Sequence, residues 1–244
     1  MKLDILAIGA HPDDVELSCS GTLYLHKQKG FKTGIVDLTQ GELGSRGSVA
    51  IRQQESSAAS EILQLDIREN LNFRDGFFKN DEEHQLKLIS IIRKYKPNIV
   101  LGTAIKDRHP DHGRSSELIA DACFLSGLLK IETELDGQSQ APWRPKRIFN
   151  YVQDQYIEPD FIIDISEVFD FKVHSILAYK SQFFSNEGGG PKTYISTDEY
   201  LNTVKYRNVM MGKKIGVNHG EGFVSRQSSL GLKDFSSLVL PEFV

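Results

Sequence analysis

Two short segments of the chain are rich in histidine and aspartate. The first, residues 10–16, reads AHPDDVE, and the second, residues 107–112, reads DRHPDH. Imidazole and carboxylate groups bind divalent metals and transfer protons, so these segments are where the chain could do chemistry. Two imidazoles and one carboxylate, with a fourth position left for water, are typical of a catalytic zinc site.

We predict that His11, Asp14 and His112 bind Zn2+. His11 and Asp14 are three residues apart in a tight turn, so their side chains can converge, and His112 can join them from the second segment. Zinc lowers the pKa of water to about 7 and polarises a carbonyl, which suits amide hydrolysis at neutral pH. Such a ligand set also accepts iron or cobalt, so the residues leave the identity of the metal open.

The residues beside these ligands supply the other groups that amide hydrolysis needs. Asp13 adjoins a ligand and points in another direction, so we predict that it is the general base. His109 can stabilise the oxyanion, protonate the leaving amine, or do both. Asp111 is predicted to hold His109 in its tautomer, as carboxylates do for other catalytic histidines.

Arg52 is the candidate substrate-binding residue. It lies at the start of a predicted helix after a glycine-rich loop, where its guanidinium could fork onto a carboxylate or sugar hydroxyls. The alternative is a surface charge paired with Glu55. His219, in the glycine-rich segment NHGEGF, could also line the site, or it could lie outside it.

Alternating apolar strands and helices must position these residues. We predict strands at 3–10, 33–39, 70–73, 98–105, 147–152 and 161–165, helices at 20–29, 49–65, 81–95, 115–129, 167–183 and 197–215, and loops at 40–48 and 186–192. This order predicts an α/β fold: a Rossmann-like, doubly wound, mostly parallel sheet with helices on both faces, in one domain over residues 1–244. Because ligands bind at the carboxyl ends of such strands, both segments should face one crevice.

Composition excludes several classes of protein. The 244 residues carry a net charge of -4 and no basic patch, so we expect no nucleic acid partner. The only cysteines, Cys19 and Cys123, form no CxxC pair and should be buried as small apolar residues. No signal peptide or membrane-spanning stretch is evident, and we expect a soluble, cytoplasmic protein without a membrane partner.

Motifs of two other enzyme classes are missing from the places where they would act. Residues 9–14 read GAHPDD where a dinucleotide-binding protein would carry GxGxxG, and two carboxylates there would repel a pyrophosphate. Residues 45–48 read SRGS, which does not fit the GxSxG elbow of a serine hydrolase. A non-catalytic metal-binding protein remains an alternative, against which the intact base and acid positions argue.

The two motifs resemble those of the LmbE-like (PIG-L) zinc-dependent N-acetylglucosamine deacetylases. The resemblance covers nearly the whole chain and includes the lead-in LDILAIGAHPDD and the loop IVDLTQGELGSRGS. Arg52 with Glu55, the segment YIEPDFIIDIS and the helix AYKSQF resemble the branch that serves bacillithiol biosynthesis. Members of that branch deacetylate N-acetylglucosaminyl malate.

The resemblance implies a role for each candidate residue. By motif, the zinc ligands fall on His11, Asp14 and His112, the base on Asp13, the oxyanion-stabilising or acid histidine on His109 with Asp111 in support, and a substrate contact on Arg52. It further implies a small-molecule sugar substrate and a homo-oligomer, since relatives are frequently hexameric. Another N-acetylated sugar conjugate is the alternative substrate. The aglycone and the roles of Glu16, Arg108 and His219 stay open.

Overall fold

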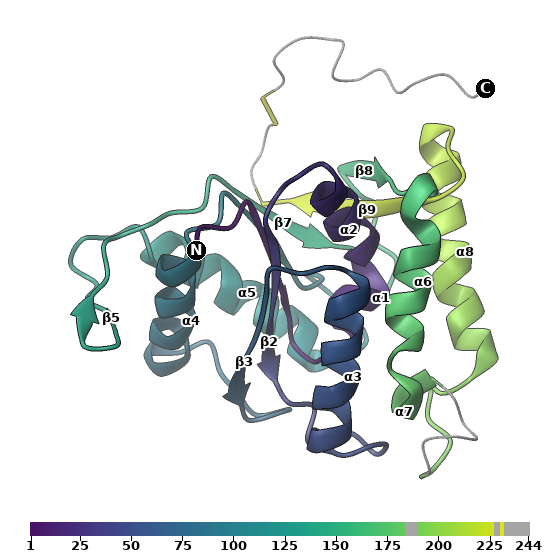
Figure 1. Cartoon of the computed structure of the whole chain (residues 1–244), viewed down its shortest axis with the longest axis horizontal. Coiled ribbons are helices and arrows are strands. Elements are labelled where there is room, and N and C mark those ends of the chain that lie inside the picture. The colour runs from purple at the N-terminus through teal and green to yellow at the C-terminus, as the bar shows by residue number, and fades with distance from the viewer. Residues whose placement is uncertain (184–189, 227–229, 232–244) are drawn as a thin grey trace.

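One sheet runs through the chain, whose computed structural model describes residues 1–183, 190–226 and 230–231. Its strands are β1 (Ile5–Gly9), β2 (Thr33–Thr39), β3 (Ile67–Phe73), β4 (Ile99–Gly102), β7 (Arg147–Tyr151), β8 (Phe161–Asp164) and β9 (Gly220–Ser225). The first five are parallel neighbours in the order β3-β2-β1-β4-β7, and β9 runs antiparallel between β7 and β8 (Figure 1). The predicted mostly parallel α/β sheet is confirmed.

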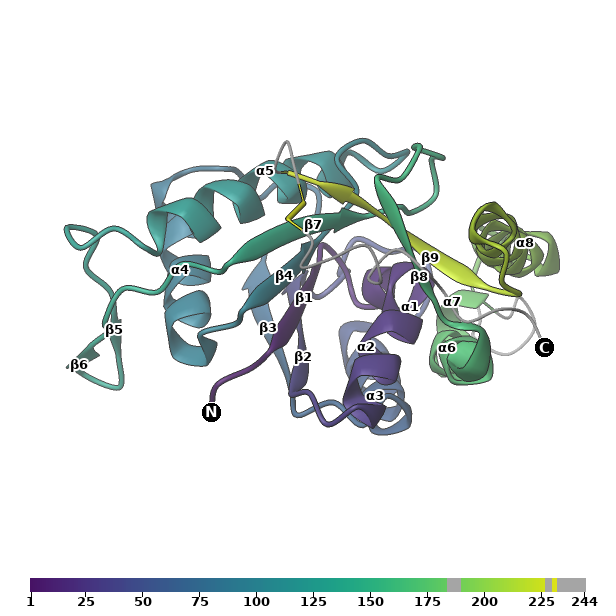
Figure 2. The same ribbon diagram turned by 90° about the horizontal axis from the view of Figure 1, so that it is seen from above.

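Helices cover both faces of this sheet. They are α1 (Asp14–Ser18), α2 (Ser20–Gln28), α3 (Val49–Ile62), α4 (Glu82–Tyr95), α5 (Pro110–Leu125), the 3-10 turn η1 (Ser166–Val168), α6 (Phe169–Leu177), α7 (Lys180–Phe183) and α8 (Asp198–Ile215). Helices α4 and α5 lie on one side, and α1, α2, α3 and α6 on the other (Figure 2). A short hairpin, β5 (Glu134–Leu135) with β6 (Gln138–Ser139), projects at one end.

Alternate side chains of β1 pack into two separate hydrophobic cores, one on each face of the sheet. Leu6 and Ile8 pack with α4 and α5, whereas Ile5 and Ala7 pack with α2, because successive side chains of a strand point to opposite faces. The two cysteines are buried and free, one in each core, as predicted. Both faces of β1 are therefore buried, and its carboxyl end carries the first histidine–aspartate segment.

Helix α5 begins five residues earlier than predicted. His109 is its N-cap and Pro110 its first residue, so Asp111 and His112 lie in the first helical turn rather than in a loop. Proline favours that position because its missing N–H has no helical partner there and its fixed φ suits a helix. The early start brings the second segment's histidines onto one helix end.

Strand β9 and the break after α6 were not predicted. No strand was predicted in the glycine-rich segment at residues 218–223, but Gly220 and Gly222 belong to β9, which pairs on both sides. A Cβ at Gly220 would lie 2.5 Å from Cγ2 of Ile162, so only glycine allows this approach. The helix predicted at 167–183 is divided into η1, α6 and α7. The loop predicted at 186–192 falls largely on residues 184–189, outside the described part.

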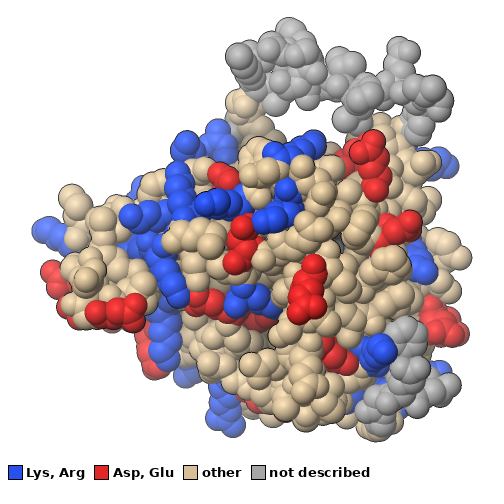
Figure 3. Space-filling view, viewed as in Figure 1, with Lys and Arg blue, Asp and Glu red and all other residues tan. Residues whose placement is uncertain are grey.

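The surface of the molecule carries charged side chains of both signs. Charges of both signs share the face seen in Figure 3, where basic side chains gather toward the upper left. Within the described residues, no helix has both the length and the apolar character needed to cross a membrane.

Candidate active site

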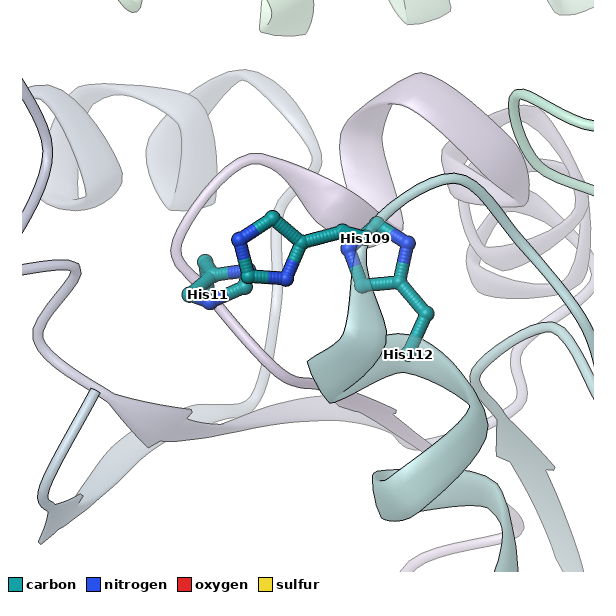
Figure 4. Close-up of side chains that lie close together, drawn as sticks. All are labelled: His11, His109 and His112. Carbon is teal, nitrogen blue, oxygen red and sulfur yellow. The ribbon is translucent and has the colours of Figure 1, made fainter. Parts of the chain in front are cut away.

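The two histidine–aspartate segments meet at one edge of the sheet. Strands β1 and β4 are hydrogen-bonded neighbours, so the loops that follow them leave the sheet side by side. His11 comes from the loop after β1, and His109 and His112 come from the start of α5 (Figure 4). The ring centroid of His11 lies 4.7 Å from that of His109 and 5.6 Å from that of His112.

Asp14 lies between two of these imidazoles. Its Oδ2 is 3.4 Å from Nδ1 of His11, and its Oδ1 is 3.1 Å from Nε2 of His112. Burial raises the pKa of Asp14, but His112 and His11 outweigh that effect and hold the pKa well below its ordinary value. The three predicted ligands therefore converge, and the carboxylate among them is ionised.

Carboxylates hold the other nitrogen of each ligand histidine. Nε2 of His11 is 3.1 Å from Oδ1 of Asp75 and 3.4 Å from Oδ2 of Asp111, and Nδ1 of His112 is 2.5 Å from Oδ2 of Asp107. Metal-binding histidines usually donate their second N–H to such a carboxylate, which fixes the ring and its tautomer. Nδ1 of His11 and Nε2 of His112 are thereby left to face the third predicted ligand.

The electrostatics of this cluster fit a divalent cation. Burial lowers the pKa of His11, but hydrogen bonds with Asp111, Asp14 and Asp75 raise it well above its ordinary value. Burial also lowers the pKa of His112, which its carboxylate partners nevertheless raise to about 9. The buried carboxylates therefore stabilise positive charge at this point. Two imidazole nitrogens and an ionised carboxylate are a donor set that zinc accepts.

His109 differs from the two ligand histidines. Its Nδ1 accepts a 3.3 Å hydrogen bond from the backbone N–H of Asp111, so the proton of the neutral ring lies on Nε2. Burial lowers the pKa of His109, and the neighbouring His11 and His112 lower it further. A neutral ring with one N–H donor can stabilise a developing oxyanion.

The carboxylate of Asp111 does not hold His109, contrary to the prediction. Its oxygens accept hydrogen bonds from the backbone N–H of Gly76 at 2.8 Å and from Nη1 of Arg114 at 2.5 Å, and it also faces His11. Because Asp111 is in the first turn of α5, its backbone meets His109 while its side chain turns toward the other histidine.

Asp13, the predicted base, has an unusual backbone. Its φ of 107° lies in a region that residues other than glycine rarely adopt. Burial raises the pKa of Asp13 to about 7, with Asp14 adding to the rise and Arg52 opposing it. A carboxylate with a pKa near neutrality is well suited to accept a proton at physiological pH.

Arg52 is buried and holds Asp13. Its Nη2 donates to Oδ2 of Asp13 and to the carbonyl of Pro12, both at 2.7 Å. Glu55, the partner expected in the alternative interpretation, instead accepts hydrogen bonds from the backbone N–H and hydroxyl of Ser181. Arg52 also lines the cleft, so contact with substrate stays a prediction beside this observed contact with the base.

These residues open onto a cleft of about 370 Å³. At its rim, Nε of Arg108 lies 3.1 Å from Oδ2 of Asp154, and the guanidinium sits 4.4 Å from the ring centroid of Tyr194. The Arg108 side chain is 52% exposed, so it is accessible to a ligand in the cleft.

Two residues with open roles lie away from the cleft. His219 stacks on Phe169 with ring centroids 3.7 Å apart and is not among the cleft-lining residues. Glu16 is fully buried, where its Oε1 accepts hydrogen bonds from Arg68 at 2.5 Å and Tyr179 at 3.1 Å. Both therefore contribute to the packing around the site.

Three residues of the site were missed by the sequence analysis. Asp107 lies in the second motif, Asp75 follows β3, and Gln153 follows β7 and donates to Oδ1 of Asp14 at 2.6 Å. Each comes after the carboxyl end of a strand, where the same rule that linked the two motifs would have placed it. Nothing in the local sequence says which predicted zinc ligand each one contacts.

The α/β sheet and the histidine–aspartate site define the class to which the chain belongs. The family model PIG-L, described as GlcNAc-PI de-N-acetylase, matches residues 6–123. The uncharacterized deacetylase YaiS of Escherichia coli is 32% identical over 62% of this chain and 83% of its own. The conserved protein TT1542 from Thermus thermophilus superimposes with a TM-score of 0.84 at 37% identity, over 95% of this chain and 98% of the other. The chain belongs to the PIG-L, or LmbE-like, deacetylase family.

Other relatives carry several activities in their names. Diacetylchitobiose deacetylase of Thermococcus kodakarensis is 25% identical over 89% of this chain and 81% of its own. A probable N-acetyl-alpha-D-glucosaminyl L-malate deacetylase of Bacillus subtilis is 24% identical over 75% and 84%. A 4-oxalmesaconate hydratase of Pseudomonas putida is 26% identical over 72% and 73%.

Proposed function

We propose that this protein is a zinc-dependent deacetylase that removes the acetyl group from N-acetylglucosaminyl malate in bacillithiol biosynthesis. The observation that carries the chemistry is the position of Asp13, a buried carboxyl with its pKa raised to about 7, next to Asp14, which lies between His11 and His112. A base beside a set of metal donors is the arrangement that metal-assisted amide hydrolysis requires.

His11, Asp14 and His112 would hold the zinc, which supplies a Lewis acid and lowers the pKa of water. Asp13 accepts the proton of the water that attacks the acetyl carbonyl. Nε2–H of His109 donates to the oxyanion of the tetrahedral intermediate. Cleavage of the C–N bond releases acetate, and the amine takes the proton that Asp13 received.

The malate assignment is supported by the rim of the cleft. Malate carries two carboxylates, and the exposed guanidinium of Arg108 is a suitable partner for one of them. The Bacillus subtilis relative is named for that substrate and supports the assignment. The chitobiose relative matches a larger share of this chain, 89% against 75%, at a similar identity. We further propose a cytoplasmic homo-oligomer, without nucleic acid or membrane partners.

An acetate-release assay tests the proposal. The protein is treated with a chelator and then assayed on N-acetylglucosaminyl malate and on free N-acetylglucosamine, with and without added zinc. We expect zinc-restored turnover of both compounds, with a higher kcat/KM for the malate conjugate. Equal kcat/KM values would contradict the malate assignment alone.

If the zinc-loaded protein releases acetate from neither compound, deacetylation of these sugars is contradicted. Because one relative is named a 4-oxalmesaconate hydratase, the next assay would then follow addition of water to that unsaturated carboxylic acid. A protein that binds no zinc would contradict the metal assignment itself.

A further inference from the structure

Asp75 makes contacts in two directions from a buried position. Its Oδ1 lies 3.1 Å from Nε2 of His11, and its Oδ2 accepts a 3.0 Å hydrogen bond from the backbone N–H of Leu43. The backbone N–H of Asp75 in turn donates to Oε1 of Glu42 at 2.8 Å. One carboxylate thus joins a predicted zinc ligand to the loop that follows β2.

That loop forms part of the cleft wall. Leu43 and the three residues after it line the cleft, although Leu43 is 59% exposed. Farther along, Nε of Arg46 donates to the carbonyl of Ser181. Because Leu43 itself is mostly exposed, its backbone hydrogen bond to Asp75 is the direct link between this part of the loop and the partner of His11.

We propose that Asp75 is a positioning residue that couples zinc binding at His11 to the order of the loop at residues 41–46. The inference rests on the proposed zinc site. Zinc bound by His11 would fix the imidazole ring and thereby the direction of its Nε2–H. The fixed Nε2–H holds the Asp75 carboxylate, whose second oxygen holds Leu43. By linkage, an ordered loop must favour zinc binding to the same extent.

Asparagine at position 75 would break this coupling with almost no change in shape. Asp75 offers two acceptor oxygens and meets two donors, the ring N–H of His11 and the backbone N–H of Leu43. An amide has one acceptor oxygen, so in either orientation its NH2 group faces a donor. Asp75→Asn must therefore lose one of the two contacts.

Two measurements on the full chain test the proposal. Zinc affinity is measured by competition with a chelator, and hydrogen exchange of the 41–46 backbone is measured by mass spectrometry with and without zinc. We expect Asp75→Asn to weaken zinc binding by about 10-fold, the lower end of the range of about 10–100-fold for lost carboxylate partners of ligand histidines, because Asp111 still lies 3.4 Å from Nε2 of His11. Zinc should slow exchange in the 41–46 segment of the unaltered protein and slow it much less in the variant at saturating zinc.

Asp81→Asn is the matched control. Asp81 also bonds a histidine, with its Oδ1 2.6 Å from Nδ1 of His84, but this pair lies outside the cleft lining. The control should keep both the zinc affinity and the zinc-dependent protection.

The outcomes separate the inference from the proposed function. If the unaltered protein binds no zinc, the proposed function fails and the inference fails with it. If the unaltered protein binds zinc but Asp75→Asn shows the same affinity and the same protection, only the coupling is overturned. Weaker zinc binding with unchanged loop protection would overturn the coupling and leave Asp75 as a partner of His11 alone.

Discussion

Asp13 combines a strained backbone, burial and an ion pair. The φ of 107° costs conformational energy, of the order of 1–3 kcal/mol for such residues, which the surrounding contacts must offset. Arg52 supplies two of those contacts through the Asp13 carboxylate and the carbonyl of Pro12. Arg52 therefore both orients the base and limits the rise of its pKa.

Replacing Asp13 with asparagine should abolish most turnover and retain zinc. Asparagine has nearly the same shape but cannot accept the proton, and general-base catalysis typically contributes about 10²–10⁴-fold. We expect a fall of that size in kcat, measured by acetate release, with unchanged zinc content by elemental analysis. Near-normal turnover in the zinc-loaded variant would show that Asp13 is not the base.

The pH dependence of kcat/KM should report the same residue. Asp13 acts in its deprotonated form, so the rate must fall as the pH drops through its pKa. That pKa is about 7 from the protein's own groups, and a bound dication lowers it, so the acid limb should lie at or below about pH 7. An acid limb above pH 8 would contradict this assignment.

Arg52→Gln should move the acid limb to higher pH. The positive charge of Arg52 lowers the pKa of Asp13, and glutamine removes that charge. Arg52→Lys keeps the charge and should shift the limb less. A pH profile that is unchanged in Arg52→Gln would contradict electrostatic contact between the two residues.

At the scale of elements, the loop after β2 approaches Arg52 closely. Gly41 has a φ of +65°, and a Cβ placed on it would lie 2.0 Å from Nη1 of Arg52. Glycine is therefore required at position 41 for two reasons: its backbone conformation and the lack of space beside the guanidinium.

Gly41→Ala should lower activity more than stability alone would explain. The added methyl must displace the Arg52 guanidinium, which would release Asp13, so we expect a clear fall in kcat. Gly137→Ala is the control, because Gly137 has a φ of +73° but no atom within 4 Å of the added Cβ. Both variants should lose roughly 1 kcal/mol of stability from the backbone, but only the first should lose activity. Equal activities would exclude the displacement.

At the scale of the whole molecule, one buried carboxylate, that of Glu221, joins the C-terminal part of the chain to its N-terminal part. Nζ of Lys172 in α6 lies 2.7 Å from Oε1 of Glu221 in β9, and both side chains are fully buried. The Glu221 carboxylate also accepts the backbone N–H groups of Gly21 and Thr22 at the start of α2. Glu221 is thus a structural link. It lies in the same glycine-rich segment as His219, which the sequence analysis considered as a residue of the site.

Glu221→Ala should destabilise the fold strongly. The substitution leaves Lys172 buried without its partner, and it removes the acceptor of two backbone N–H groups at the start of α2. Breaking such a buried pair costs about 3–5 kcal/mol. Urea unfolding would measure the loss. Lys214→Ala, which removes an exposed pair with Glu158, is the control and should change stability little. A small effect of Glu221→Ala would mean that water or rearrangement satisfies Lys172.

The sequence by itself determined the mostly parallel sheet and the meeting of its two histidine–aspartate segments at one edge. Apolar strands alternate with helices, and the rule that ligands gather at strand carboxyl ends brought His11, Asp14 and His112 together. Those inferences depend on the local pattern of apolar and polar residues and on residue chemistry, and both can be read directly from the sequence.

Only the tertiary structure decided the partners of these residues. Asp75 comes from the end of β3, and Asp111 faces His11 rather than His109 because α5 begins at Pro110. Strand β9 likewise forms through pairing with β7 and β8, despite its glycines. Side-chain direction depends on contacts between segments distant in sequence, so residue spacing could identify the reactive groups but not the hydrogen bonds that orient them.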